Sequence, residues 1–348
     1  MNDYEKNENL ELDDDLFNDE DINYQSYSSD EGGKRKTPVS TIILALLFIV
    51  VIILVIIVVK NAFGGNDNID EAIVDNSTTT QADKTQSTLP KNFENIELTE
   101  EDKNKGELIL VNGTHSTTDL SESKMVDLFE TKTASYTLRN SKMFVSKDIY
   151  SNINAWFDDF YKESGKRTIN IIDAFRSHAT QKQLFDAALG RYETEKEAVK
   201  NVQKQGYSEH HTGLCIDIQV YENGYAYTFN GEGEYEWVVN NAYKYGFIQR
   251  YPEGKTTITG VNTELGHFRY IGVAHATAMK QSNASCFESY IDLLRSYTFD
   301  GEHLNVNCDN GDKYEIYFTN SLSVPVPTDR EYTVSGNNVD GFIVTIKN

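Results

Sequence analysis

Two short segments of the sequence bring together histidine and carboxylate side chains of the kind that hydrolytic metal sites use. The first, SEHHTGLCID, begins at Ser208 and contains His210 and Asp217. In the second, ELGHFRYIG, Glu264 stands three residues before His267, so a turn can bring both side chains to one site. Histidine and aspartate are zinc ligands, and a nearby glutamate can act as general base. The residue types indicate metal-assisted hydrolysis, although an aspartate in a strand is more often a hydrogen-bond partner than a ligand.

A strand is the element best suited to position the first segment. Residues 214–220 (LCIDIQV) form a largely apolar run in which Asp217 is the one charged residue. A carboxylate in such a strand is costly to bury unless it is paired or bound to a metal. In a regular strand Asp217 shares a face with Cys215, and the apolar neighbours share the other face. Gly213 permits the tight bend that would bring His210 over the Asp217 face.

Helix and strand patterns surround these segments without a regular β–α–β rhythm. Helices are predicted from a start at Thr180 and over residues 153–163, 195–204, 234–245 (ended by Gly246) and 288–297. Strands are predicted over residues 107–112, 168–174, 214–220, 313–318 and 341–346. The predicted fold class is therefore α+β, with a small mixed or antiparallel sheet, flanking helices and a small β-rich extension after them.

One segment has the length and composition of a membrane span. Residues 39–59 (VSTIILALLFIVVIILVIIVV) contain no charged residue, and at about 1.5 Å per residue they match a hydrocarbon core of roughly 30 Å. The run is longer than the apolar part of a cleavable signal peptide and follows a long polar segment. Lys34, Arg35 and Lys36 precede it, whereas Lys60 alone flanks its other side. The positive-inside rule then predicts a cytoplasmic N-terminus and an external C-terminal part.

The two candidate segments resemble the motifs of a known family. SEHHTGLCID resembles the Ser-x-His-x-x-Gly-x-x-x-Asp motif of the VanY-type D-alanyl-D-alanine carboxypeptidases, and ELGHFRYIG resembles that family's Glu-x-x-His-x-Arg-Tyr segment. Upstream, AFRS at residues 174–177 followed by Gln181 resembles its Arg-Ser…Gln segment. The resemblance covers residues 106–282 and implies a DD-peptidase or hedgehog-like fold.

The resemblance implies a role for each candidate residue. The zinc ion would have three protein ligands: His210, Asp217 and His267. Glu264 would be the catalytic base, because zinc lowers the pKa of its bound water to about 7 and a base must take the proton. Three residues would bind the substrate peptide and its terminal carboxylate: Arg176, Gln181 and Ser208. An arginine can hold a carboxylate through two hydrogen bonds at once.

The implied reaction is removal of the terminal D-alanine from peptidoglycan stem peptides or precursors outside a bacterial cell. An LD-carboxypeptidase or a wall endopeptidase of the same fold could carry an identical zinc site. A non-catalytic wall-binding or sensor protein is an alternative of another class, but it predicts a missing ligand or base, and all four residues are present. Where the family often has Pro-Trp, this chain has Leu265-Gly266, which opens one wall of the expected pocket.

Five parts are predicted along the chain. They are an acidic cytoplasmic tail (residues 1–38), a transmembrane helix (39–59), an extracellular linker (60–105), a zinc peptidase domain (106–282) and a C-terminal β-rich extension (283–348). The predicted location is the cell membrane, with a single pass and an extracellular catalytic domain. The tail is expected to be disordered and could bind a cytoplasmic partner, since residues 1–33 carry a net charge of −11.

Charge and cysteine content exclude two further classes. The net charge of −22 argues against a nucleic-acid partner, which would require a basic face. The three cysteines, Cys215, Cys286 and Cys308, are too few and too widely spaced for a disulfide framework or a CxxC zinc knuckle. A single Cys286–Cys308 bridge remains open on the sequence alone.

Overall fold

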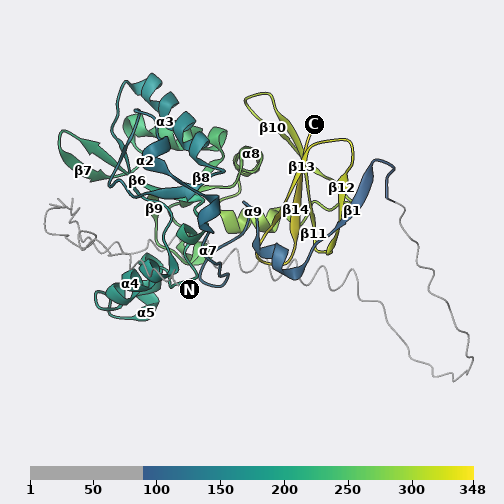
Figure 1. Ribbon diagram of the computed structural model, residues 1–348, viewed down its shortest axis with the longest axis horizontal. Coiled ribbons are helices and arrows are strands. Elements are labelled where there is room, and N and C mark those ends of the chain that lie inside the picture. Colours follow the sequence, from purple (N-terminus) through teal and green to yellow (C-terminus); the bar gives the residue numbers. More distant parts are fainter. Residues whose placement is uncertain (1–88) are drawn as a thin grey trace, which may run out of the picture. The chain divides into compact units, whose positions relative to one another are not determined.

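The computed structural model describes residues 89–348 of the protein (Figure 1). The predicted cytoplasmic tail, residues 1–38, the predicted transmembrane helix, residues 39–59, and most of the predicted linker lie outside the described residues. Within residues 89–348, no helix combines the length and the apolar character that a membrane span requires.

A mixed sheet forms the centre of the region that carries the two candidate segments. Its strand order is β3-β5-β6-β9-β8, with β7 also paired to β6. The strands are β3 (Thr137–Leu138), β5 (Ile169–Asp173), β6 (Cys215–Glu222), β7 (Tyr225–Thr228), β8 (Phe247–Tyr251) and β9 (Glu264–Tyr270). Only the short β3–β5 pair is parallel among these described strands. A mixed sheet was expected, and its strands β5 and β6 match the segments predicted at residues 168–174 and 214–220.

Helices flank this sheet and hold its apolar faces. The longer ones are α3 (Tyr150–Ser164), α4 (His178–Leu189), α5 (Glu195–Asn201), α6 (Glu236–Asn241), α8 (Val273–Gln281) and α9 (Phe287–Leu294). Short helices are α2 (Leu128–Thr131), α7 (Thr256–Thr259) and the 3-10 turns η3 (Glu100–Asn104), η4 (Glu122–Lys124), η5 (Glu209–Thr212), η6 (Gly233–Tyr235) and η7 (Ala242–Tyr245). The helix predicted over residues 234–245 is thus interrupted, with α6 between two 3-10 turns.

The start of helix α4 differs from the prediction. Thr180 was expected to cap this helix, but the cap is Ser177, whose Oγ accepts a hydrogen bond from the Thr180 backbone N–H at 3.2 Å. Serine and threonine are both good capping residues. Ser177 takes the role because it lies directly before the first helical turn, whose backbone N–H groups are free. The helix therefore begins at His178.

Helix α3 lies beside the sheet (Figure 1). Its buried face is aromatic and packs into the core below it. The Trp156 ring stacks on Phe247 of β8 at 5.1 Å between centroids and meets Phe268 of β9 edge-on at 5.0 Å. Each buried aromatic or aliphatic side chain of this size contributes about 1.5–3 kcal/mol to stability. Phe268 adjoins His267 in the sequence, so this packing fixes the strand that carries a candidate ligand.

The strand predicted over residues 107–112 is wrong. Leu108, Ile109, Leu110 and Val111 are buried, but the segment is irregular. Its carbonyl groups are satisfied by side chains instead of a strand ladder, because Arg269 Nη2 donates to the oxygens of Glu107 and Ile109 at 2.9 and 3.1 Å. An apolar run alone does not distinguish these two ways of pairing a buried backbone.

The C-terminal extension is β-rich, as predicted. An antiparallel sheet has the order β10 (Leu304–Asn307), β11 (Lys313–Thr319), β14 (Phe342–Lys347) and β13 (Tyr332–Gly336). In a separate pair, β12 (Ser323–Pro327) of the extension joins β1 (Phe93–Glu97). Outside the extension, β2 (Met125–Asp127) pairs with β4 (Phe144–Ser146). The three cysteines are all free, so the Cys286–Cys308 bridge does not form.

The position of β1 corrects the predicted end of the linker. Residues 93–97 were assigned to an extracellular linker reaching residue 105, yet they pair along the whole of β12. Phe93 and Ile96 pack against the apolar cluster that contains Val324 and Val326. Two apolar residues in an acidic segment give no periodic signal, so only the long-range pairing reveals this strand.

Candidate active site

Asp217 and His267 face each other across neighbouring antiparallel strands. The register of β6 and β9 pairs Asp217 directly with His267. His267 Nδ1 lies 2.7 Å from Asp217 Oδ1, and although both atoms are buried, they are not aligned as a hydrogen bond. A buried polar atom without a partner costs about 1–3 kcal/mol. Two such atoms directed at one point indicate a place where a cation binds.

His210 reaches the same point from the 3-10 turn η5, just before β6. Its Nε2 lies 3.2 Å from Asp217 Oδ2, while its Nδ1 contacts the Ala174 carbonyl oxygen. A carbonyl oxygen only accepts hydrogen bonds, so Nδ1 carries the proton and the Nε2 lone pair is free to bind a metal. Gly213 makes the predicted bend: its φ is +63°, and a Cβ added to it would lie only 2.7 Å from Leu120 Cδ2.

The three groups fit a zinc ion. His210 Nε2, the Asp217 carboxylate and His267 Nδ1 supply two imidazoles and one carboxylate from a turn and two strands. Hydrolytic zinc sites use three protein ligands of this type and leave a fourth position for water. A cation here would also satisfy the Asp217 and His267 atoms that have no hydrogen bond. The arrangement brings together all three ligands predicted from the sequence.

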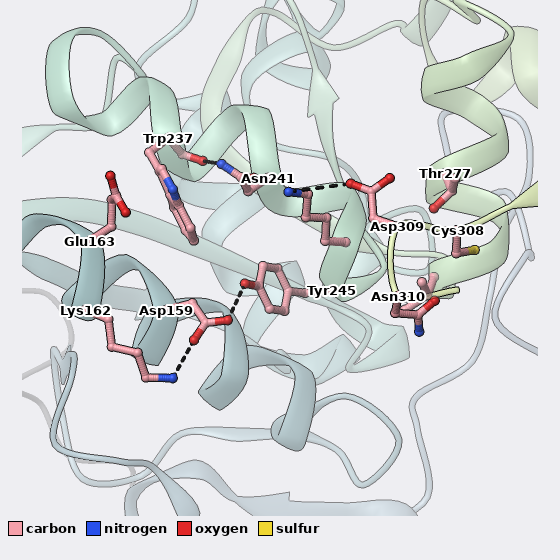
Figure 2. Close-up of a pocket in the computed structure, with 12 residues that line it drawn as sticks. Asp159, Lys162, Glu163, Trp237, Asn241, Tyr245, Thr277, Cys308, Asp309 and Asn310 are labelled. Carbon is pink, nitrogen blue, oxygen red and sulfur yellow. Dashed lines mark hydrogen bonds and ion pairs between the residues drawn. The ribbon is translucent and has the colours of Figure 1, made fainter. Parts of the chain in front are cut away.

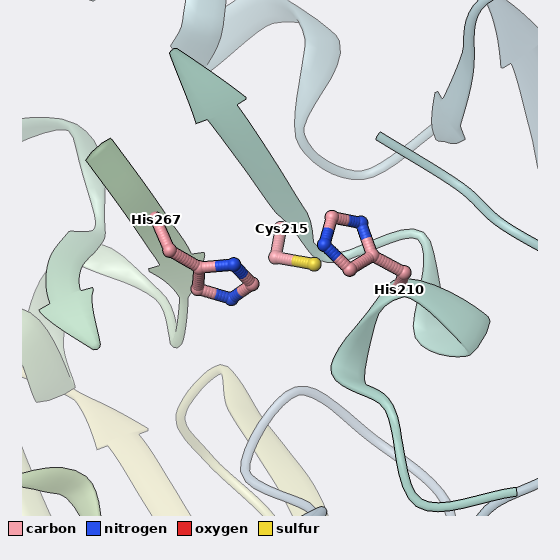
Figure 3. A group of neighbouring side chains, drawn as sticks. All are labelled: His210, Cys215 and His267. Atoms are coloured by element: carbon pink, nitrogen blue, oxygen red, sulfur yellow. The ribbon is translucent and has the colours of Figure 1, made fainter. Parts of the chain in front are cut away.

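Cys215 lies beside these ligands. Figure 3 shows its side chain between the imidazole rings of His210 and His267, whose centroids are 5.1 Å apart. The sulfur and one nitrogen of each ring lie within 4.8 Å of one another. Cys215 is fully buried on the same strand as Asp217, as the two-residue period predicted. The thiol is therefore adjacent to the metal site rather than remote from it.

Glu264 stands at the edge of this cluster. Its Oε2 lies 4.0 Å from His267 Nδ1. The two residues were expected on a turn, but both belong to β9, whose pairing with β8 is irregular: Gln249 pairs with Phe268 and Tyr251 with Glu264. This bulge places them on one side. Burial raises the pKa of Glu264 to about 7, and a bound cation would oppose that shift.

Two of the three predicted substrate-binding residues lie together. Arg176 Nη1 donates to Gln181 Oε1 at 2.7 Å, and the same guanidinium group pairs with Asp173. Ser208 is separate in role: its buried Oγ accepts from the His210 backbone N–H at 3.4 Å and caps η5. Arg176 and Gln181 thus form one polar unit, whereas Ser208 supports the turn that carries His210.

Comparison with known proteins identifies the family. A sequence model described as D-alanyl-D-alanine carboxypeptidase (VanY) matches residues 142–273. A D-alanyl-D-alanine carboxypeptidase from Enterococcus faecium is 33% identical over 263 residues, which cover 74% of this chain and 80% of that protein. The chain belongs to the VanY-type D-alanyl-D-alanine carboxypeptidase family.

Two further similar proteins extend this finding. The bifunctional D-Ala-D-Ala dipeptidase and D-Ala-D-Ala carboxypeptidase VanXYC of Enterococcus gallinarum is 31% identical over 138 residues, covering 37% of this chain and 69% of that protein. The crystal structure of the vancomycin resistance D,D-dipeptidase VanXYg, in complex with a D-Ala-D-Ala phosphinate analog, has a TM-score of 0.64 and 28% identity. It covers 74% of this chain and 99% of that one, which confirms the mixed α/β fold.

Two carboxylates of this VanY-type site were not predicted from the sequence. Asp173 of β5 is the cross-strand partner of Asp217, and its carboxylate lies within 4.8 Å of the donor atoms of His210 and Asp217. Glu209 is buried beside His210, and although burial opposes it, Arg250 and Arg269 hold the pKa of Glu209 well below its usual range. Asp173 lies near the end of a predicted strand and Glu209 adjoins a predicted ligand, but neither position alone indicates its partner.

A cavity lies away from the predicted metal ligands. It has a volume of about 620 Å³, and Figure 2 shows Trp237 and Tyr245 on its wall together with Asp159 and Asp309. Several of its polar groups are already paired, since Tyr245 Oη donates to Asp159 at 2.8 Å and Lys244 lies 3.5 Å from Asp309. The predicted site residues do not line this cavity.

Proposed function

We propose that this protein is a zinc D-alanyl-D-alanine carboxypeptidase that removes terminal D-alanine from peptidoglycan stem peptides or precursors. The observation that carries the proposal is that the Asp217 carboxylate lies between two imidazole nitrogens, 2.7 Å from His267 Nδ1 and 3.2 Å from His210 Nε2. Family membership supports the substrate class, because the Enterococcus faecium relative is a D-alanyl-D-alanine carboxypeptidase.

In this proposal each side chain has a defined task. His210, Asp217 and His267 would hold the zinc ion, which would supply Lewis-acid chemistry and lower the pKa of a bound water to about 7. Glu264, within 4.0 Å of His267, accepts a proton from the attacking water and returns it to the amine of the leaving D-alanine. The water oxygen bonds to the carbonyl carbon and the peptide C–N bond breaks. One proton of the water reaches the leaving amine through Glu264, and the other is released when the new carboxyl group ionises.

Arg176 is proposed to bind the terminal carboxylate of the substrate. Asp173 and Gln181 fix its guanidinium group, and its side chain is only 14% exposed. A guanidinium group held in this way can offer two parallel N–H groups to a carboxylate. Ser208 is proposed to contribute through the turn that it caps, next to His210.

Gly266 does not open the pocket wall in the way that the sequence suggested. A Cβ on Gly266 would lie 2.5 Å from the Ile218 carbonyl oxygen and 3.5 Å from Phe229 Cβ. Residue 266 is therefore directed at the backbone of β6, and a large side chain would not fit there in this backbone. The Tyr251 ring, 4.9 Å from the His267 ring between centroids, borders the site from β8 instead.

Product analysis tests the proposal. The purified protein is incubated with muropeptides that end in D-Ala-D-Ala, with muropeptides that end in a single D-Ala, and with free D-Ala-D-Ala, and products are identified by mass. We expect loss of one D-alanine from the first substrate, and none when a chelator is present. Cleavage only of the second substrate would favour an LD-carboxypeptidase, and cleavage within the stem a wall endopeptidase. No cleavage of any substrate would favour a binding or sensor protein.

We also propose that the protein is a single-pass membrane protein with its catalytic domain outside the cell. The support is the uncharged run at residues 39–59 with Lys34, Arg35 and Lys36 before it. The acidic tail, residues 1–38, would then face the cytoplasm and any partner there. Protease treatment of intact cells should remove the catalytic domain and spare the tail. Loss of the tail with a protected domain would reverse this topology.

A further inference from the structure

Glu209 is a buried carboxylate that contacts a proposed zinc ligand. It is 1% exposed and lies in η5 next to His210. Its Oε1 accepts hydrogen bonds from Arg250 Nε at 2.8 Å and Arg269 Nη1 at 3.0 Å. Its Oε2 lies 3.4 Å from His267 Nε2. One oxygen is thus held by two guanidinium groups, and the other faces the ligand histidine.

Arg250 connects this carboxylate to the helix α9. Its Nη1 and Nη2 donate to the two oxygens of Glu288 at 2.9 and 2.7 Å. Asn112 Nδ2 also donates to Glu288, at 3.3 Å. Glu288 lies beyond residues 142–273, the part that matches the family's sequence model. The contacts run without a break from α9 through Arg250 and Glu209 to His267.

The charges of this network balance only when all its members are present. Arg250 and Arg269 are fully buried, and Glu209 and Glu288 supply two negative charges to their two positive charges. Removing one partner of a buried ion pair leaves an uncompensated charge, which is strongly destabilising. Loss of Glu288 would leave Arg250 with Glu209 as its remaining carboxylate partner among these four residues, and Glu209 would be drawn away from His267.

We propose that Glu209 is a positioning residue that holds the His267 ring in its metal-binding orientation, and that Glu288 in α9 supports it through Arg250. This inference rests on the proposed zinc site. His267 can present Nδ1 to a metal only if its proton is on Nε2, and a carboxylate facing Nε2 stabilises that arrangement. The bidentate Arg250–Glu288 pair fixes the direction of the guanidinium group that orients Glu209.

Zinc affinity in two variants tests this proposal without any substrate. In Glu209→Gln the amide offers one acceptor oxygen where the carboxylate offers two, so an N–H group must face either an arginine or His267. The dissociation constant for zinc, measured by competition with a chromogenic chelator, should rise about 10–100-fold, as is typical when a metal ligand loses its hydrogen-bond partner. Glu288→Gln should raise it by a smaller factor, although Glu288 has no described contact with a ligand.

Glu315→Gln is the matched control. Glu315 in β11 accepts from Arg330 Nη1 at 2.8 Å and pairs with His303, so its loss breaks an ion pair in the C-terminal extension without touching Glu209. Thermal unfolding of the metal-free proteins reports the general loss of stability in each variant. Zinc affinity should be unchanged in this control even where its unfolding temperature falls.

Each outcome decides the proposal. Wild-type zinc affinity in folded Glu209→Gln would overturn it, as would an equal loss of affinity in Glu288→Gln and Glu315→Gln. If Glu209→Gln does not fold, the comparison of Glu288→Gln with Glu315→Gln decides alone. A wild-type protein that binds zinc but cleaves no D-Ala-ending peptide would overturn the proposed function and leave this affinity series intact.

Discussion

His267 Nδ1 lies 2.7 Å from Asp217 Oδ1 because β6 and β9 pair in a register that places the two residues opposite each other. The proposed metal site therefore depends on the pairing of two strands that are distant in the sequence. Zinc bound across this pair would link β6, β9 and the η5 turn of His210. Metal binding and the stability of the sheet should be coupled.

Removal of one ligand should remove the metal. His267→Ala deletes the Nδ1 donor, and the two remaining ligands cannot hold zinc tightly, so metal analysis of the purified variant should show a large loss of zinc. His303→Ala is the control, because His303 contacts Glu315 and the Phe299 carbonyl oxygen in the C-terminal extension. Zinc content in His267→Ala equal to that of the control would exclude His267 as a ligand.

Arg176 should set the preference for a free terminal carboxylate. Arg176→Ala removes the guanidinium group that Asp173 and Gln181 hold. We expect kcat/KM for a peptide with a free terminal carboxylate to fall by about 10²-fold or more, because a buried charged contact is lost. The peptide with an amidated end should change little, and Arg176→Lys should lie between. An unchanged ratio of acid to amide cleavage would assign Arg176 a structural role only.

Glu107 should make the protein less stable as the pH rises. Burial, with a contribution from Asp148, raises the pKa of Glu107 from 4.5 to about 7. The folded protein therefore disfavours the ionised form, and stability declines between pH 4.5 and about 7 and is level above that range. Glu107→Gln stays neutral and should be more stable than the wild type by about 1–3 kcal/mol at alkaline pH.

Denaturant unfolding of both metal-free proteins across that pH range measures this difference. The advantage of Glu107→Gln should be small at acidic pH and grow as the pH approaches 7. A difference that is the same at every pH would show that the Glu107 carboxyl ionises equally in the folded and unfolded chains.

Gly213 should tolerate no side chain. Its φ is +63°, and an added Cβ would lie 2.7 Å from Leu120 Cδ2 and 3.0 Å from the Ser146 nitrogen. Gly254→Ala is a matched control, because its φ is +72° but no atom lies within 4 Å of an added Cβ. A left-handed alanine alone costs about 1–2 kcal/mol. Gly213→Ala should lose more unfolding free energy than the control and also bind zinc more weakly; equal losses would refute the close approach.

The sequence allowed local parts of the site to be predicted. The two-residue period of β6 placed Cys215 and Asp217 on one face, and Gly213 marked the bend that carries His210. The assignment of His267 to the same site came from the family resemblance, because strand register across a long separation has no local signal. The structure then supplied the distance that joins them.

The residues that sequence analysis missed depend on long-range pairing. Glu209 looks like a surface carboxylate until Arg250 and Arg269 are seen to contact it. The apolar run at residues 107–112 looks like a strand until Arg269 is found on its carbonyl groups. In each case a buried charge from another element decides the local structure, and no window of neighbouring residues contains that information.

The role of Glu264 as general base is the centre of the mechanism, and Glu264→Gln tests it most directly. Glutamine has nearly the same shape and leaves His210, Asp217 and His267 unchanged, but it cannot accept a proton from water near neutral pH. Zinc content should equal that of the wild type, while kcat for D-alanine release should fall by about 10²–10⁴-fold. Near-normal turnover with zinc retained would contradict the account, and loss of zinc would make Glu264 a ligand rather than the base.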